Sequence, residues 1–161
     1  ILEGIYFYSG FMFFYNLERN GKMPGSAQEI RYINRDENTH LWLFRNIIRE
    51  LQKENPELFT DEMKDELRER MKTGVEQEIL WGHYVIGDKI QGINKKLIED
   101  YIKYLGNKRL KEINLEPLYV GYDKNPATWV DIQSNANSVK TDFFEARSTA
   151  YAKAATLVDD L

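Results

Sequence analysis

Four stretches of the chain repeat apolar residues at the three- and four-residue spacing of an amphipathic helix. The first runs from Ile1 to about Arg19, and the second runs from Ser26 to Asn55. A third is expected from Thr60 to about Ile86 and a fourth from Asn94 to Ile113. The alternating pattern of a strand does not occur at any useful length. The sequence therefore predicts an all-α fold.

Residues typical of helix ends separate these stretches. The segment Asn20–Gly25 contains two glycines and a proline, which indicate a turn. After it, Ser26 and Glu29 match a capping box, in which each side chain binds the other residue's free backbone amide. Thr60 and Asn94 are suitable N-caps for the third and fourth helices.

The character of the sequence changes after Ile113. Residues 114–140 are rich in Pro, Gly and Asn, which favour turns, and the last twenty residues fit either a short helix or a mobile tail. We therefore expect two parts. Residues 1–113 would form helices of a bundle, and residues 114–161 would form an irregular segment with a C-terminal tail.

Composition excludes several classes of function. The 22 Lys and Arg residues against 26 Asp and Glu give a net charge of −4, so no basic surface for a nucleic acid polymer is expected. The chain has no Cys, which excludes disulfides and thiolate chemistry and fits a cytoplasmic location. No apolar run approaches the roughly 20 residues that cross a bilayer, so no membrane association is expected. The unusual figure is the 13% aromatic content.

The first candidate site lies in the segment Arg35–His40. Glu37 and His40 are three residues apart on a predicted helix, so their side chains leave the same face. In carboxylate-bridged two-metal bundles, two helices each supply such a Glu-x-x-His pair and two others each supply one acid. Oxygen-rich ligands with one His per metal suit iron or manganese better than zinc or copper. By itself the motif is short, and a solvated helix face is the commoner explanation.

Glu3 strengthens the case for a metal site. It follows Ile1 and Leu2 in an apolar stretch, where burial of an unpaired carboxylate would be very costly. Glu3, Phe7 and Phe11 recur every four residues, so one stripe of the helix carries an acid and two aromatic rings. The alternative is an aromatic core stripe with Glu3 at an exposed helix end.

Together these segments resemble a known family. Leu2–Phe11 and Arg35–Leu41 look like the second half of the metal site in the radical-generating small subunit of class I ribonucleotide reductase. Asn125–Trp129 is similar to the Asn-Pro-x-x-Trp segment of that family. Asp142–Arg147, with Tyr151 beyond it, resembles the tail that docks on the catalytic large subunit. The order and approximate spacing of the motifs match over nearly all of the chain.

The resemblance implies roles for the matching acidic and histidine residues. Glu3, Glu37 and His40 would be ligands of a dinuclear centre of iron, manganese or both. Asp36 would be the neighbouring acid that links a ligand histidine to the radical-transfer route. The implied fold is part of the ferritin-like helical bundle of the small subunit.

The resemblance also implies roles for aromatic and tail residues. Phe7 and Phe11 would belong to the apolar pocket around the radical site. Tyr151 matches the tail tyrosine that relays the radical between subunits, and Glu145 matches an acidic tail residue. The implied activity is that of a ribonucleoside-diphosphate reductase, whose large subunit reduces ribonucleotides with the oxidising equivalent that the small subunit generates. The implied partners are the large subunit and a second small subunit.

Half of the family's ligand set cannot be assigned. The pattern needs an earlier acid and an earlier Glu-x-x-His, and the other histidine, His83, follows Glu78 by five residues. That spacing does not put the two side chains on one helix face, so we interpret His83 as a non-ligand. We therefore expect the N-terminal half of the small subunit to lie on a separate chain or in a missing segment.

Two other functions remain open from the sequence. One is a related ferritin-like protein that uses a two-metal bundle as an oxidase, although it would need no relay tail such as that of Tyr151. The other is a non-catalytic helical interaction module that has lost the remaining ligands. We interpret Trp42 and Trp81 as core or interface packing rather than as redox relays.

Overall fold

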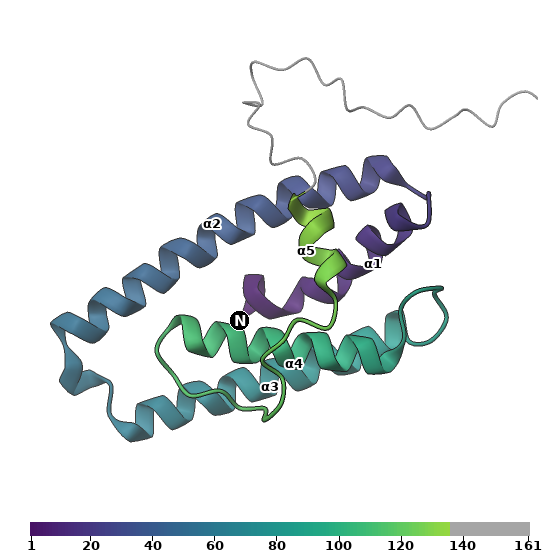
Figure 1. The fold of residues 1–161 in the computed structure, drawn as a ribbon. Coiled ribbons are helices and arrows are strands. Elements are labelled where there is room, and N and C mark those ends of the chain that lie inside the picture. The colour runs from purple at the N-terminus through teal and green to yellow at the C-terminus, as the bar shows by residue number, and fades with distance from the viewer. Residues whose placement is uncertain (136–161) are drawn as a thin grey trace, which may run out of the picture.

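The computed structural model describes residues 1–135, and every regular element in that range is helical (Figure 1). The all-α prediction is therefore confirmed for the described residues. The predicted tail residues Glu145 and Tyr151 lie outside them. The elements are a π-helical turn at Leu2–Tyr6 (η1), α1 at Tyr8–Arg19, α2 at Pro24–Glu54, a 3₁₀ turn at Pro56–Leu58 (η2), α3 at Asp61–Val85, α4 at Lys95–Glu112 and α5 at Thr128–Asn135.

The first helical segment lies in the middle of the structure. Figure 1 shows η1 and α1 between the long α2 on one side and the paired α3 and α4 on the other. The turn η1 contacts α2, α3 and α4, while α5 packs across α1 and α2. The segment that carries Glu3 is therefore held by three other helices.

The core is formed mainly by apolar and aromatic side chains of the first helical segment and α4. Ile5, Met12 and Tyr15 are fully buried, and they belong to the same cluster as Ile98 and Tyr101. Burial of each such side chain contributes about 1.5–3 kcal/mol to folding. Part of the aromatic excess is thus core packing around the element that carries Glu3.

Two of the predicted helix starts are confirmed by their capping hydrogen bonds. The Thr60 hydroxyl accepts a hydrogen bond from the Met63 amide at 3.2 Å. The Asn94 side chain accepts one from the Leu97 amide at 2.8 Å. In both cases a short polar side chain satisfies a backbone N–H that the helix itself leaves free.

The capping box predicted at Ser26 and Glu29 is wrong. The helix α2 begins at Pro24, and the residue before it is Met23, whose backbone is left-handed with φ of 47°. Proline suits the first helical position because its fixed φ matches the helix and its missing N–H is not needed there. The helix therefore begins two residues earlier than Ser26, which lies inside it.

The segment after the fourth helix is less irregular than predicted. The helix α4 ends at Glu112, next to the predicted boundary, but α5 forms inside the turn-rich residues 114–140. The Asn125 side chain accepts the Ala127 amide at 2.7 Å and donates to Asp131 at 2.8 Å. So short a helix has little stability of its own, and its packing against α1 and α2 supplies the stabilisation. The division of the chain at residue 113 stays a prediction.

None of the described helices combines the length and the apolar character that crossing a membrane requires.

Candidate metal centre

The first predicted helix begins with a π-helical turn that contains Glu3. The turn η1 is π-helical, and regular α-helix begins only at Tyr8. A π turn contains an extra residue and occurs frequently at functional sites. Its Gly4 and Ile5 are buried, whereas the Glu3 side chain is about one quarter exposed. The regular α-helical spacing expected for Glu3, Phe7 and Phe11 is therefore broken at Glu3, which lies in the wider π-helical turn.

The structure brings the three predicted ligands together from two elements. Glu37 and His40 lie one turn apart on α2, and His40 Nδ1 is 3.1 Å from Glu37 Oε2. The same nitrogen is 3.4 Å from Glu3 Oε1. One possible ligand atom from each residue lies within 4.8 Å of the others. Packing of α2 on η1 thus unites residues that are far apart in the sequence.

The charges of this cluster favour a cation. Among the described residues, Glu3 and Glu37 form their ion pairs with His40 and none with Lys or Arg. The hydrogen bond to Glu37, followed by the negative charge of Glu3, raises the pKa of His40. Two partly buried carboxylates and an imidazole form a donor set of the kind that holds iron or manganese. The residues present therefore fit half of the implied metal centre.

The side that carries His40 is open. The imidazole is 52% exposed, whereas the Glu37 side chain is 16% exposed. Large apolar residues on the following turns of α2 are exposed as well, including Trp42 and Phe44. Groups from another polypeptide segment can therefore reach this side of the cluster.

The other predicted site residues are placed differently. Asp36 is 64% exposed and forms an ion pair with Arg35 at 3.3 Å. Within the described part of the chain, it does not belong to the cluster of Glu3, Glu37 and His40. Phe11 is buried and Phe7 is partly buried, and their ring centroids are 6.1 Å apart. Glu145 and Tyr151 belong to the segment that the structure does not describe, so their roles stay predictions.

His83 lies apart from the cluster, as the sequence interpretation expected. Its Nε2 is 3.0 Å from the carbonyl oxygen of Lys95, in a contact between the end of α3 and the start of α4. The carboxylate and histidine cluster of the described residues does not include it. This contact gives His83 a structural role at a helix junction.

Two ionisable residues beside η1 were not predicted from the sequence, the buried Glu78 and the partly buried Arg109. Glu78 on α3 is 2% exposed, accepts the Ser9 amide at 3.0 Å, and has its pKa raised to about 7 by burial. Arg109 on α4 donates to the Gly4 carbonyl at 3.3 Å and to the Tyr8 hydroxyl at 2.8 Å. A signal for Glu78 was available, because it continues the buried stripe of α3 formed by Met71, Gly74, Val75 and Gly82. An ionisable residue on such a stripe is rarely buried without a partner.

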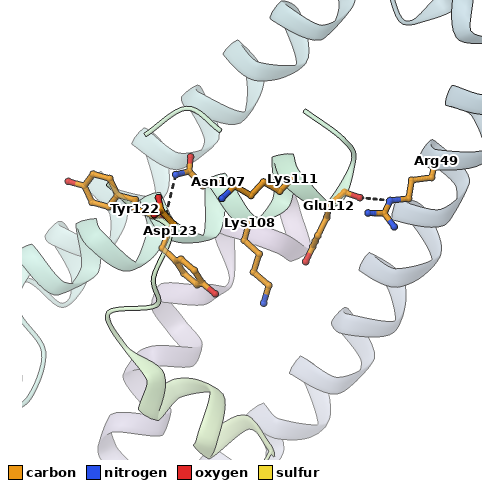
Figure 2. Close-up of a pocket in the computed structure, with 8 residues that line it drawn as sticks. Arg49, Asn107, Lys108, Lys111, Glu112, Tyr122 and Asp123 are labelled. Atoms are coloured by element: carbon orange, nitrogen blue, oxygen red, sulfur yellow. Dashed lines mark hydrogen bonds between the residues drawn. The ribbon is translucent and has the colours of Figure 1, made fainter. Parts of the chain in front are cut away.

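A separate pocket of about 320 Å³ lies between α2 and the C-terminal half of α4 (Figure 2). Arg49 Nε donates to the Glu112 carbonyl at 2.8 Å, which joins the two helices at one side of the pocket. On the other side, Asn107 donates to the Tyr122 carbonyl at 3.2 Å. The pocket contains none of the three clustered residues, so it is distinct from the candidate metal centre.

Comparison with known proteins decides what kind of chain carries this cluster. The family model for the ribonucleotide reductase small chain matches residues 1–126, which include η1 and all of α2, α3 and α4. The chain belongs to the ribonucleotide reductase small-chain family. The resemblance inferred from the sequence motifs is therefore confirmed.

Individual small chains are similar over nearly the whole of this one. The ribonucleoside-diphosphate reductase subunit beta of Treponema pallidum is 64% identical, over 100% of this chain and 46% of the relative. The corresponding subunit of Halalkalibacterium halodurans is 47% identical, over 95% of this chain and 44% of the relative. The present chain thus spans less than half the length of these relatives.

Solved structures of small chains share the fold. The ribonucleotide reductase R2 subunit from Clostridium botulinum matches with a TM-score of 0.80 and 56% identity, over 83% of this chain and 42% of that chain. A putative class I ribonucleotide reductase from Bacillus halodurans matches with a TM-score of 0.79 and 45% identity, over 82% and 47%. The helices described here are therefore arranged as in about half of a small chain.

Proposed function

We propose that this chain is the C-terminal half of a ribonucleoside-diphosphate reductase small subunit and supplies half of its dinuclear metal centre. The observation that carries this proposal is the cluster of Glu3, Glu37 and His40, whose possible ligand atoms lie within 4.8 Å of one another. Membership of the small-chain family supports the assignment of this cluster to a metal centre.

The charge of the cluster argues that the centre needs further ligands. Glu3 and Glu37 supply two negative charges, and His40 must be neutral to bind a metal. Two cations of charge +2 or +3 in a partly buried site require more anionic compensation. We infer that the N-terminal half of the small subunit supplies the remaining acids and histidine, and that it covers the open side beside His40.

In this proposal, the residues around the candidate metal centre divide into metal ligands and an apolar lining. The helix α2 holds Glu37 and His40 on one face, and η1 directs the Glu3 carboxylate toward them. A bound dinuclear iron or manganese centre would supply the oxidising chemistry that O₂ activation provides. Phe7 and Phe11 would keep water away and resist oxidation next to it.

The proposed route out of the site uses residues that face outward or lie in the tail. Asp36 is exposed, so its carboxylate is available to a ligand histidine from the N-terminal half. Tyr151 would relay the oxidising equivalent to the catalytic large subunit, and Glu145 would support docking of the tail. The large subunit would then reduce the ribonucleotide, and a second small subunit would complete the assembly.

The two histidines of the chain provide a matched test. In the small subunit completed by its N-terminal half, His40→Ala should lower metal affinity by more than about 100-fold. Loss of a metal ligand weakens binding more than loss of a residue that only contacts a ligand, which costs about 10–100-fold. His83→Ala should leave metal affinity unchanged, because His83 contacts only a helix junction. Metal titration followed by metal analysis measures both. Equal effects of the two substitutions would contradict the ligand assignment.

A further inference from the structure

One buried and one partly buried ionisable side chain bind the backbone where the hydrogen-bond pattern of the first helical segment changes. Glu78 Oε1 on α3 accepts the N–H of Ser9 at 3.0 Å. Arg109 Nε on α4 donates to the carbonyl of Gly4 at 3.3 Å. Gly4 and Ser9 are five residues apart, which is the spacing of a π-helical hydrogen bond. The two side chains thus bind the acceptor and the donor that a continued π turn would pair.

Neither charge is explained by packing alone. Glu78 is 2% exposed, and among the described residues it forms no ion pair with a Lys or Arg. The Arg109 side chain is 10% exposed, and its charge is compensated by an ion pair with Glu112 at 3.1 Å. Burying an unpaired ionisable group is costly, and an apolar side chain of similar volume commonly fills such a position as well or better. The unpaired Glu78 therefore needs a reason beyond stability, and the ion pair of Arg109 leaves its Nε to bind the Gly4 carbonyl.

Two glycines give these side chains access to the backbone. A Cβ on Gly4 would lie 3.1 Å from both Arg109 Nε and Leu41 Cδ2. A Cβ on Gly82, one turn after Glu78 on α3, would lie 2.8 Å from Ser9 Oγ. Real Cβ atoms rarely approach so closely. The close approach of α4 to η1 therefore depends on Gly4, and that of α3 to α1 depends on Gly82.

We propose that Glu78 and Arg109 are positioning residues that hold η1 in its π-helical form and thereby set the direction of Glu3. Glu3 directly precedes Gly4, the residue that Arg109 binds. Conversion of the π turn to regular α-helix would shift the register by one residue, a rotation of roughly 100° about the helix axis. The Glu3 carboxylate would then leave Glu37 and His40. The link to metal binding rests on the proposed function, whereas the link to the form of η1 does not.

Two substitutions of Glu78 separate its hydrogen bond from its charge. Glu78→Gln keeps an acceptor oxygen for the Ser9 amide, and Glu78→Met removes the acceptor while keeping a similar length. The experiment uses the small subunit completed by its N-terminal half, first without metal. Hydrogen exchange should be at least about 10-fold faster at residues 8–10 in Glu78→Met than in the parent, and no faster than in the parent in Glu78→Gln.

The second readout is metal affinity, measured by titration with Mn²⁺ or Fe²⁺. Glu78→Met should lower it by about 10–100-fold, as loss of an outer-shell partner does, and Glu78→Gln should restore it. Parental exchange and affinity in Glu78→Met would overturn the proposal. Equal losses in both variants would also overturn it, because Gln retains the acceptor.

Arg109 provides an independent pair of variants, which decides the question if Glu78→Met does not fold. Arg109→Met removes the donor to the Gly4 carbonyl together with the contacts to Tyr8 and Glu112. The double variant Tyr8→Phe/Glu112→Gln removes the hydroxyl contact and the ion pair but keeps the donor to Gly4. Faster exchange at residues 4–10 and weaker metal binding in Arg109→Met alone would support the proposal. Equal behaviour of these two variants would overturn it. If the parent protein itself takes up no metal, the proposed function fails, and the exchange data still decide the role of the two residues.

Discussion

The imidazole of His40 lies between carboxylates from two different elements. Glu37 approaches it from the preceding turn of α2, and Glu3 approaches from η1. The hydrogen bond to Glu37, followed by the negative charge of Glu3, raises the pKa of His40 and so favours its protonated form. A ligand imidazole is neutral, so a proton on His40 must leave when a metal binds. The positive charge of the metal would then compensate the two acids.

Glu78 offers a pH-dependent test at the level of one residue. Burial raises the pKa of Glu78 from 4.5 to about 7, so the folded protein holds this proton more tightly than the unfolded chain does. Stability therefore falls as the pH rises from about 4.5 to about 7, where only the unfolded chain ionises. Glu78→Gln removes this titration. We expect it to raise the free energy of unfolding by up to about 3 kcal/mol at pH 8.

The gain from Glu78→Gln should shrink toward zero as the pH falls to about 4.5, because the parent carboxyl is then protonated in both states. Urea denaturation curves at several pH values measure the difference. If Glu78→Gln raises the free energy of unfolding by the same amount at pH 4.5 and at pH 8, the ionisation of Glu78 does not cause the gain in stability.

At the level of the elements, the sequence carries most of the information on where helices lie. Periodic apolar residues predicted the long helices, and short polar caps predicted the starts at Thr60 and Asn94. The start of α2 was misplaced because the proline at position 24 is a stronger determinant than the capping box at Ser26. These features depend on residues that are close in the sequence.

The π turn and α5 could not be predicted in the same way. The spacing of Glu3, Phe7 and Phe11 fits an ordinary α-helix, and the groups that bind the widened turn come from α3 and α4. Residues 128–135 lie in a turn-rich stretch and become helical through packing on α1 and α2. The candidate ligands were predicted from motif spacing and from the resemblance to the family, whereas Glu78 and Arg109 approach the first helical segment only through tertiary contacts.

Substitutions of two glycines in the first helical segment test how tightly η1 is packed. Gly4→Ala should lower the free energy of unfolding by about 1–3 kcal/mol and weaken metal binding, because its Cβ would press on Arg109 and Leu41. Gly10→Ala is the matched control on α1, where a Cβ meets no described atom within 4 Å. It should raise stability by about 0.5–1 kcal/mol through helix propensity. Thermal unfolding distinguishes them, and an equal gain in both variants would refute close packing at Gly4.

At the scale of the whole molecule, the described helices expose apolar surface that a folded protein normally covers. Trp42, Phe44 and Ile47 on α2 are about half exposed, and Trp81 and Tyr84 on α3 are more than half exposed. Trp42 and Trp81 are therefore not core residues of this chain. Their exposure agrees with packing against another polypeptide, and such patches usually mark an interface.

We propose that this chain holds half of a dinuclear metal centre, which the other half of the small subunit completes. The most direct measurement is metal content with electron paramagnetic resonance, on this chain alone and then combined with the N-terminal half. We expect two metal ions per small subunit in the combination and no such pair in the chain alone. Absence of bound metal in both samples would contradict this proposal and would favour a non-catalytic helical module.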